Sequence, residues 1–198
     1  MKGLTKKESE ILLSLFKDFT NNYNANSLSK KIGITPRGAL KMLKNLKSQN
    51  ILTSREFGKA VFYKINLGDE YAIKLMSILL MEEAREKASR WLSEFKELLE
   101  CVDIAIIFGS IIRNPKTAND IDLLIVFKKE RYSMIEKEIN QKREISSKVI
   151  HVVKQTPDNL IKNLKKKDEV VLNIIKSGYV LQGYEKLVKI IENVTSLQ

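Results

Sequence analysis

Apolar residues follow different spacings in three parts of this 198-residue chain. Up to residue 67, helical spacing gives way to two short apolar runs. From about 70 to 100, apolar residues recur every three or four positions with no Pro or Gly. Beyond 101, unbroken apolar runs typical of buried strands alternate with helical segments. The pattern predicts a two-domain protein of the α+β or α/β class, with domains at 1–67 and 101–198 joined by a linker at 68–100.

The first part opens with two predicted helices. Apolar residues recur at helical spacing over 11–19, and the turn formers of 21–26 then end the helix. Ser27 can cap a short second helix that runs to Ile32, and Gly33 supplies the turn after it.

A third helix and a hairpin follow. Thr35 is a suitable N-cap, and Pro36 stands at the first helical position, where proline is best tolerated. The helix should bury Ala39, Leu43 and Leu46 and leave Arg37, Lys41, Lys44 and Lys47 outward. The runs 51–53 and 60–65, joined across Gly58, predict two strands of a β-hairpin.

This order resembles a winged helix-turn-helix domain. In that family the start of the third helix enters the DNA major groove and the hairpin contacts the backbone or minor groove. The resemblance implies a set of DNA-contacting residues. Pro36, Arg37 and Lys41 would face bases, Lys44, Lys47, Arg55 and Lys59 would face phosphates, and Thr35 belongs to the same set. An alternative is that the domain serves only to dock another protein.

Charge favours DNA over a protein partner. Residues 1–67 hold thirteen Lys and Arg against four Asp and Glu, a net of 13 − 4 = +9, out of +11 for the whole chain. An acidic polymer such as double-stranded DNA is the natural partner of so basic a segment.

The linker is predicted to be one helix from about 70 to 100. Its first half, 75–81, is apolar on more than one side. We expect it to pack on the winged domain and on a second copy of the chain, which gives a homodimer. Alternatively, the extra apolar surface covers the C-terminal domain.

The densest chemical signal lies between Phe108 and Val126. An apolar run, 104–108, ends at Gly109-Ser110, and a second apolar run begins with Asp120-Ile121-Asp122. Residues two apart on a strand share a face, so both carboxylates point to one spot. Two hard oxygen ligands there make a Mg²⁺ site, beside a turn whose N–H groups suit phosphate oxygens.

This arrangement resembles the minimal nucleotidyltransferases of the polymerase-β superfamily. The resemblance implies that Asp120 and Asp122 hold Mg²⁺ with a nucleoside triphosphate and take part in catalysis. It also implies nucleotide-binding residues, namely Gly109, Ser110, Arg113 and Lys116. Residues 114–117 depart from the usual sequence of the family. The alternative is a glycine turn beside two surface aspartates.

A third carboxylate, usual in active members, is not evident. Its expected place is on the strand predicted at 148–153, where His151 stands instead. An imidazole can accept a proton but brings no negative charge to a magnesium pair. His151 is therefore a candidate catalytic residue, and the alternative is a hydrogen-bonded core histidine.

The remaining pattern completes an α/β domain with helices on one face of a mixed sheet. Helices are predicted at 132–142, 157–166, 169–176 and from 185, and a short strand at 179–182. We expect a soluble protein of the cytoplasm, because no leader and no membrane-length apolar run is evident. Cys101 is the chain's single cysteine and fits a small buried residue.

Two functions from different classes fit these patterns. The first is a DNA-binding transcriptional regulator whose nucleotidyltransferase-like domain binds Mg²⁺ and a nucleoside triphosphate. The second is an active nucleotidyltransferase that modifies a protein or small-molecule hydroxyl, and by resemblance a toxin protein is a candidate partner. We favour the regulator, because the catalytic half lacks one expected group.

Overall fold

The computed structural model describes residues 3–196, and the chain divides into two compact units between Leu79 and Leu80. The division falls within helix α4 (Glu70–Lys87), so the predicted linker contributes residues to each unit. In the described residues, no helix has both the length and the apolar character needed to cross a membrane.

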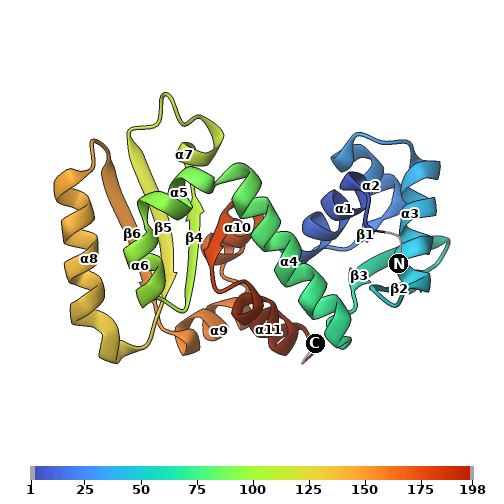
Figure 1. Ribbon diagram of the computed structural model, residues 1–198. Helices are drawn as coiled ribbons and strands as arrows, with labels where there is room; N and C mark the ends of the chain where they lie inside the picture. The colour runs from blue at the N-terminus through green and yellow to red at the C-terminus, as the bar shows by residue number, and fades with distance from the viewer. Residues whose placement is uncertain (1–2, 197–198) are drawn as a thin grey trace. The chain divides into compact units, whose positions relative to one another are not determined.

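The N-terminal unit is a winged helix-turn-helix, as predicted. Its elements are α1 (Lys6–Lys17), β1 (Tyr23–Asn24), α2 (Ala25–Ile32), α3 (Pro36–Ser48), β2 (Leu52–Phe57) and β3 (Ala60–Ile65), followed by the start of α4 (Figure 1). The strands form an antiparallel sheet in the order β1-β3-β2. Three helices followed by a hairpin define the fold without reference to any other protein.

Side-chain caps set the helix starts in this unit, and one cap differs from the prediction. Asn24, not Ser27, caps α2: its side chain accepts from the Ser27 N–H at 2.9 Å, while Ser27 Oγ accepts from the Asn24 N–H at 3.0 Å. This capping box satisfies two helix-end donors at once, so the helix starts three residues earlier than predicted. Thr35 caps α3 as predicted, with Pro36 at the first position.

Helix α3 has the predicted faces. Ala39, Leu43 and Leu46 are fully buried. The four cations of its outer face are all exposed: Arg37, Lys41, Lys44 and Lys47.

The single helix predicted for 70–100 is three helices, so that prediction was wrong. After α4 come α5 (Ser89–Glu94) and α6 (Lys96–Cys101), and the backbone leaves helical geometry at Ala88 and Phe95. Neither break contains Pro or Gly. The bends allow Trp91 and Phe95 to be almost fully buried on the sheet of the C-terminal unit, and this tertiary packing outweighs the local helix preference.

The C-terminal unit is built on a four-stranded mixed sheet. Its strands are β4 (Ile104–Phe108), β5 (Asp120–Val126), β6 (Val149–Gln155) and β7 (Tyr179–Gln182), in the order β6-β5-β4-β7. Strands β5 and β6 are parallel, and the other pairs are antiparallel. The helices are α7 (Ser110–Arg113), the 3-10 turn η1 (Lys129–Arg131), α8 (Tyr132–Ile145), α9 (Pro157–Lys165), α10 (Glu169–Ser177) and α11 (Tyr184–Thr195).

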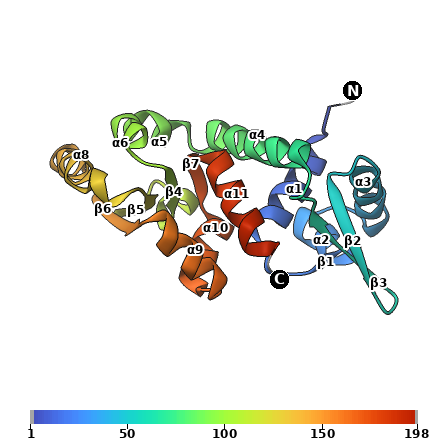
Figure 2. The same ribbon diagram turned by 90° about the horizontal axis from the view of Figure 1, so that it is seen from below.

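Helices lie against both faces of this sheet (Figure 2). On one face, α5, α6 and α8 pack with Ala105, Ile107 and the other strand residues that share their side. The sequence predicted helices on one face only, and this part of the prediction is corrected by a second helical layer. Helices α10 and α11 contact β4 from the other side, where Ile104 and Ile106 are each 1% exposed. Leu124 and Val126 of β5 are fully buried, whereas Asp120 and Asp122, nearer the start of the same strand, are only partly buried.

Candidate functional site

The turn after β4 brings the backbone against a carboxylate. Gly109 has φ +83° and ψ −154°, a conformation available essentially to glycine alone. A Cβ built at this position would lie 2.0 Å from Asp122 Oδ2 and 3.0 Å from Asp122 Cγ. Two independent features therefore require glycine here: the backbone conformation and the close approach of the Asp122 carboxylate.

Strand β5 carries both acidic residues on one face. Asp120 and Asp122 are each partly buried, and Ile121 between them points into the core on the opposite face. Asp122 pairs with Phe108 across the antiparallel β4. The Ser110 hydroxyl, from the first residue of α7, donates to Asp120 Oδ1 at 3.0 Å. The structure thus gathers Gly109, Ser110 and both aspartates, as the sequence predicted.

The two carboxylates repel each other in this position. Burial raises the pKa of Asp122, the charge of Asp120 raises it further, and the nearby His151 lowers it. A bound cation would favour the charged form of both groups. Oxygen ligands from two carboxylates suit one Mg²⁺ that is also held by phosphate oxygens, since this ion commonly uses one or two carboxylates together with its substrate.

His151 stands beside the acidic pair on the neighbouring strand. It is in register with Asp122 on the parallel β6, and its side chain is exposed. The alternative of a core histidine is therefore wrong. Among residues 3–196, no group of three or more His, Cys, Asp and Glu side chains is arranged to hold a metal ion. A third carboxylate is accordingly not supplied by the described residues, and the catalytic role of His151 stays a prediction.

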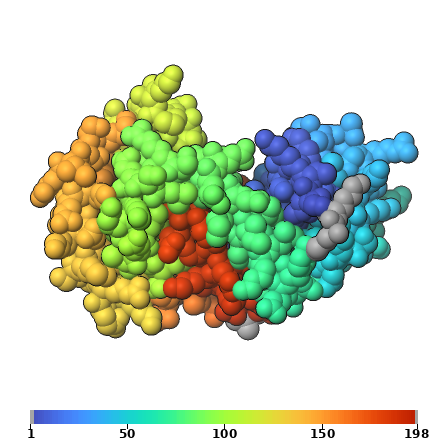
Figure 3. Space-filling view, in the orientation of Figure 1, coloured from blue at the N-terminus to red at the C-terminus, as the bar shows by residue number. Residues whose placement is uncertain are grey.

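The segment after α7 carries the two remaining predicted nucleotide contacts. Arg113 ends α7 and Lys116 follows it, and both are exposed. Figure 3 shows this part of the chain standing out from the surface of the C-terminal unit. Asn114 organises the turn, because its carbonyl accepts from the N–H groups of Thr117 and Ala118 at 3.2 and 3.0 Å. The sequence departs from the family here, yet a hydrogen-bonded turn still forms.

Sequence reasoning missed one residue that positions this segment. Lys148, just before β6, donates from Nζ to the carbonyl of Ala118. The backbone N–H of Val149 also donates to the Asn119 carbonyl, at 3.2 Å. Together they fix the chain that enters β5 just ahead of Asp120. A lysine before a strand is ordinary, so the sequence held no signal for this contact.

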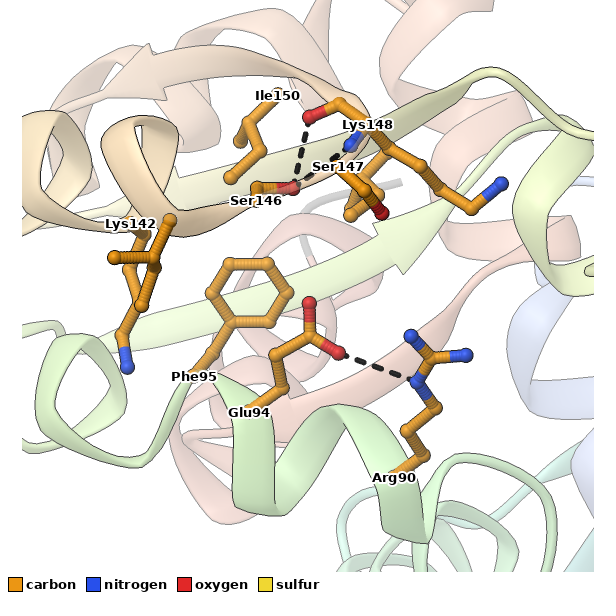
Figure 4. A pocket seen from close by; sticks show the side chains of 10 residues that line it. Arg90, Glu94, Phe95, Lys142, Ser146, Ser147, Lys148 and Ile150 are labelled. Carbon is orange, nitrogen blue, oxygen red and sulfur yellow. Dashed lines mark hydrogen bonds and ion pairs between the residues drawn. The ribbon is translucent and has the colours of Figure 1, made fainter.

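A pocket of about 250 Å³ opens on the face of the same sheet that α5, α6 and α8 cover. Phe95, Ile121 and Ile150 line it, together with charged side chains of α5 and α8 (Figure 4). Arg90 at its rim is paired with Glu94 at 3.2 Å. None of its lining residues is a predicted nucleotide or metal contact, so this pocket is distinct from the acidic site.

The predicted DNA contacts are divided between the start and outer face of α3 and the hairpin of the N-terminal unit. Arg55 and Lys59 are exposed on the hairpin, and the cations of α3 are exposed as described. Thr35 is exposed too, but its hydroxyl accepts from the Gly38 N–H at 3.1 Å as a helix cap.

Sequence comparison identifies the C-terminal domain. Residues 92–186 match the sequence model of the family described as "Polymerase beta, Nucleotidyltransferase". This confirms the predicted nucleotidyltransferase domain. No relative was found among curated proteins.

Several solved structures are weakly similar to the chain. The homodimeric winged helix-turn-helix DNA-binding domain Mb0332 from Mycobacterium bovis is 19% identical, with 40% of this chain and 70% of that one covered and a TM-score of 0.32. Adhesin competence repressor AdcR from Streptococcus pyogenes is 14% identical over 71% and 81%, with a TM-score of 0.37. A ZitR variant from Lactococcus lactis in complex with DNA is 19% identical over 72% and 75%, with a TM-score of 0.34. Scores this low support no argument, so the N-terminal fold rests on its own elements.

Proposed function

We propose that the protein is a DNA-binding transcriptional regulator whose C-terminal domain binds a nucleoside triphosphate with Mg²⁺ as an effector. The observation that carries the proposal is helix α3, which packs three apolar residues inward and leaves Arg37, Lys41, Lys44 and Lys47 exposed. Cations on one face of a recognition helix, in a segment (residues 1–67) of net charge +9, suit the phosphates and base edges of a major groove. Chromosomal DNA as the partner implies a cytoplasmic protein.

The acidic site supports nucleotide binding. Asp120 and Asp122 would hold Mg²⁺, whose charge would offset that of the phosphate oxygens. The backbone N–H groups at Gly109 and Ser110 stand at the same turn, and Arg113 and Lys116 add positive charge on the exposed segment after it. The Ser110–Asp120 hydrogen bond holds one carboxylate in place for this role.

Transfer of a nucleoside monophosphate is the second candidate function. The exposed His151 favours it, because its imidazole stands in register with Asp122 and can accept a proton from an acceptor hydroxyl. It brings no third negative charge, however, and this is why we rank binding above turnover. The acceptor would be a protein or small-molecule hydroxyl, and a toxin protein is one candidate partner.

Self-association completes the proposal. On α4, Tyr71, Ile78 and Met81 follow helical spacing and are 45%, 51% and 42% exposed. A two-fold symmetric homodimer would bury such an apolar stripe and present two copies of α3 to a palindromic site.

The DNA-binding part is tested with Arg37→Ala/Lys41→Ala. Removal of each side chain that binds a base should weaken binding of the selected duplex by about 1–3 kcal/mol. The matched control is Lys162→Ala/Lys165→Ala, which removes the same charge from the exposed surface of α9. Anisotropy titrations at several salt concentrations measure both. Equal binding by the α3 variant and the parent would show that the winged domain docks a protein instead.

The nucleotide-binding part is tested with Asp120→Asn/Asp122→Asn. A triphosphate should raise the melting temperature of the parent in a Mg²⁺-dependent way, because a ligand specific to the folded state stabilises it. The variant keeps side-chain size and should lose the Mg²⁺-dependent part of the shift. Asp158→Asn, on the exposed start of α9, is the control. A shift in the double variant as large as in the parent would place the nucleotide elsewhere.

A further inference from the structure

The hairpin of the N-terminal unit has two chemically different faces. Strand pairing places Arg55 opposite Phe62, Phe57 opposite Ala60 and Thr53 opposite Lys64. Because side chains alternate along a strand, these residues share one face. The other face carries Leu52 and Tyr63, which are 2% and 3% exposed and pack into the unit. We call the first set, residues 53, 55, 57, 60, 62 and 64, the outer face of the hairpin.

Only positive charge lies on this outer face. Arg55 and Lys64 are both exposed there, and Lys59 is exposed at the turn. Glu56, the one acidic residue of the two strands, alternates onto the inner face. Its position is supported by the buried Tyr63, whose pKa is raised by burial and then by the charge of Glu56. The outer face is therefore matched to a polyanion.

Two aromatic rings lie among these cations. Phe57 and Phe62 meet edge to face, with ring centroids 6.0 Å apart and planes at 66°. Phe57 is nevertheless 61% exposed, at the end of a hairpin whose tip extends away from the three helices (Figure 2). The pair leaves much of the Phe57 ring open to a flat partner.

We propose that the outer face of the hairpin binds single-stranded nucleic acid, with bases stacked on Phe57 and phosphates paired with Arg55 and Lys64. Aromatic rings beside cations are the combination that binds unpaired strands, because every base offers a flat face and every linkage a negative charge. A duplex hides its base faces, and so it would leave Phe57 unused.

Other occupants fit the outer face less well. A purely apolar partner would leave Arg55 and Lys64 without counter-charge, and a second copy of the hairpin would bring like charges together. DNA and RNA strands share the chemistry that the face recognises. The inference goes beyond the proposed function, since it requires neither an operator duplex nor the acidic site.

The test uses the full-length protein with fluorescent oligo-dT and oligo-U of equal length, read by anisotropy. Phe57→Ala should weaken binding by about 5- to 150-fold, the range typical of the loss of one stacked base. Phe57→Trp should bind at least as well as the parent and show quenched tryptophan emission on binding. Phe57→Leu keeps an apolar side chain without a ring face and should behave like Phe57→Ala. Tighter binding of one oligonucleotide identifies the natural strand as DNA or RNA.

Controls separate this inference from simple charge attraction and from duplex binding. Val170→Ala removes a 64% exposed apolar side chain from the C-terminal unit and should change nothing. Arg37→Ala/Lys41→Ala should weaken duplex binding and leave oligo-dT binding intact, so the two proposals fail separately. Binding of polyphosphate as tight as that of oligo-dT, or full binding by Phe57→Leu, would overturn the inference. Thermal melting confirms that each variant is folded.

Discussion

Replacement of Gly109 by alanine tests whether the site depends on close approach between backbone and carboxylate. The added methyl group meets two obstacles. The first is the backbone conformation at position 109, φ +83° and ψ −154°, which costs a residue with a Cβ about 1–3 kcal/mol. The Cβ would also lie 2.0 Å from Asp122 Oδ2, so the carboxylate must turn away.

The two effects have different readouts. We expect Gly109→Ala to lower the free energy of unfolding by about 1–3 kcal/mol, mostly from backbone strain. Displacement of the Asp122 carboxylate should in addition abolish the Mg²⁺-dependent stabilisation by a triphosphate. Urea unfolding measures the first effect and thermal shift the second. In an Asp122→Ala background the carboxylate is absent and only the Cβ of residue 122 remains, 3.3 Å away, so the glycine substitution should there cost little beyond the backbone strain.

Gly33→Ala is the matched control. Gly33 also has positive φ, +70°, but a Cβ there meets nothing within 4 Å. It should cost about 1–2 kcal/mol, typical of left-handed backbone for a residue with a Cβ, and leave the nucleotide response unchanged. The reasoning is refuted if Gly109→Ala is as stable as the parent and keeps its full response to Mg²⁺ and nucleotide.

Three further variants test other parts of the molecule. Ile78→Lys should convert the proposed dimer to a monomer in sedimentation at micromolar concentration, and a parent that is itself monomeric would rule the dimer out. His151→Asp should raise nucleotidyl transfer from a labelled triphosphate above the slow or absent rate expected of the parent, whereas no change would argue against a catalytic position. Glu136 forms an ion pair with Lys154, and the hydrogen bond from Lys154 lowers the pKa of Glu136. Glu136→Gln removes this ion pair. Because the pKa of Glu136 is lower in the folded state, the ion pair stabilises the protein at pH values above the unfolded-state pKa. This stabilisation is lost as the pH falls through the folded-state pKa. The variant should therefore be less stable by up to about 1 kcal/mol near neutral pH, and urea titrations should show the difference vanishing below about pH 4.

Local sequence signals predicted most of the elements around the site. Gly109-Ser110 and Asp120-x-Asp122 lie at strand ends, where a turn and a period of two fix which groups meet. Thr35-Pro36 likewise fixed the start of α3, because both cap and proline act within one helical turn. These interactions are short in sequence, and so the sequence alone reveals them.

Predictions failed where distant packing decides the backbone. Nothing local breaks the helix at Ala88 or Phe95; the break follows from burying Trp91 and Phe95 on strands that come later in the chain. The exposure of His151 could not be predicted either. The sequence of an apolar strand does not show which of its residues a second layer of helices will leave uncovered. The contact of Lys148 with Ala118 spans thirty residues and has no pattern of its own.

The position of β4 in the sheet has a consequence for synthesis of the chain. Strand β4 pairs with β5 on one side and with β7 on the other, and β7 begins 71 residues after β4 ends. At ribosomal rates of about 5–20 residues per second, the edge of β4 that pairs with β7 stays unpaired for roughly 4–14 s after β4 is synthesised. During this interval an apolar strand with unpaired backbone groups is open to wrong partners. The C-terminal unit is thus most exposed to aggregation during translation, until β7 has been synthesised and pairs with β4.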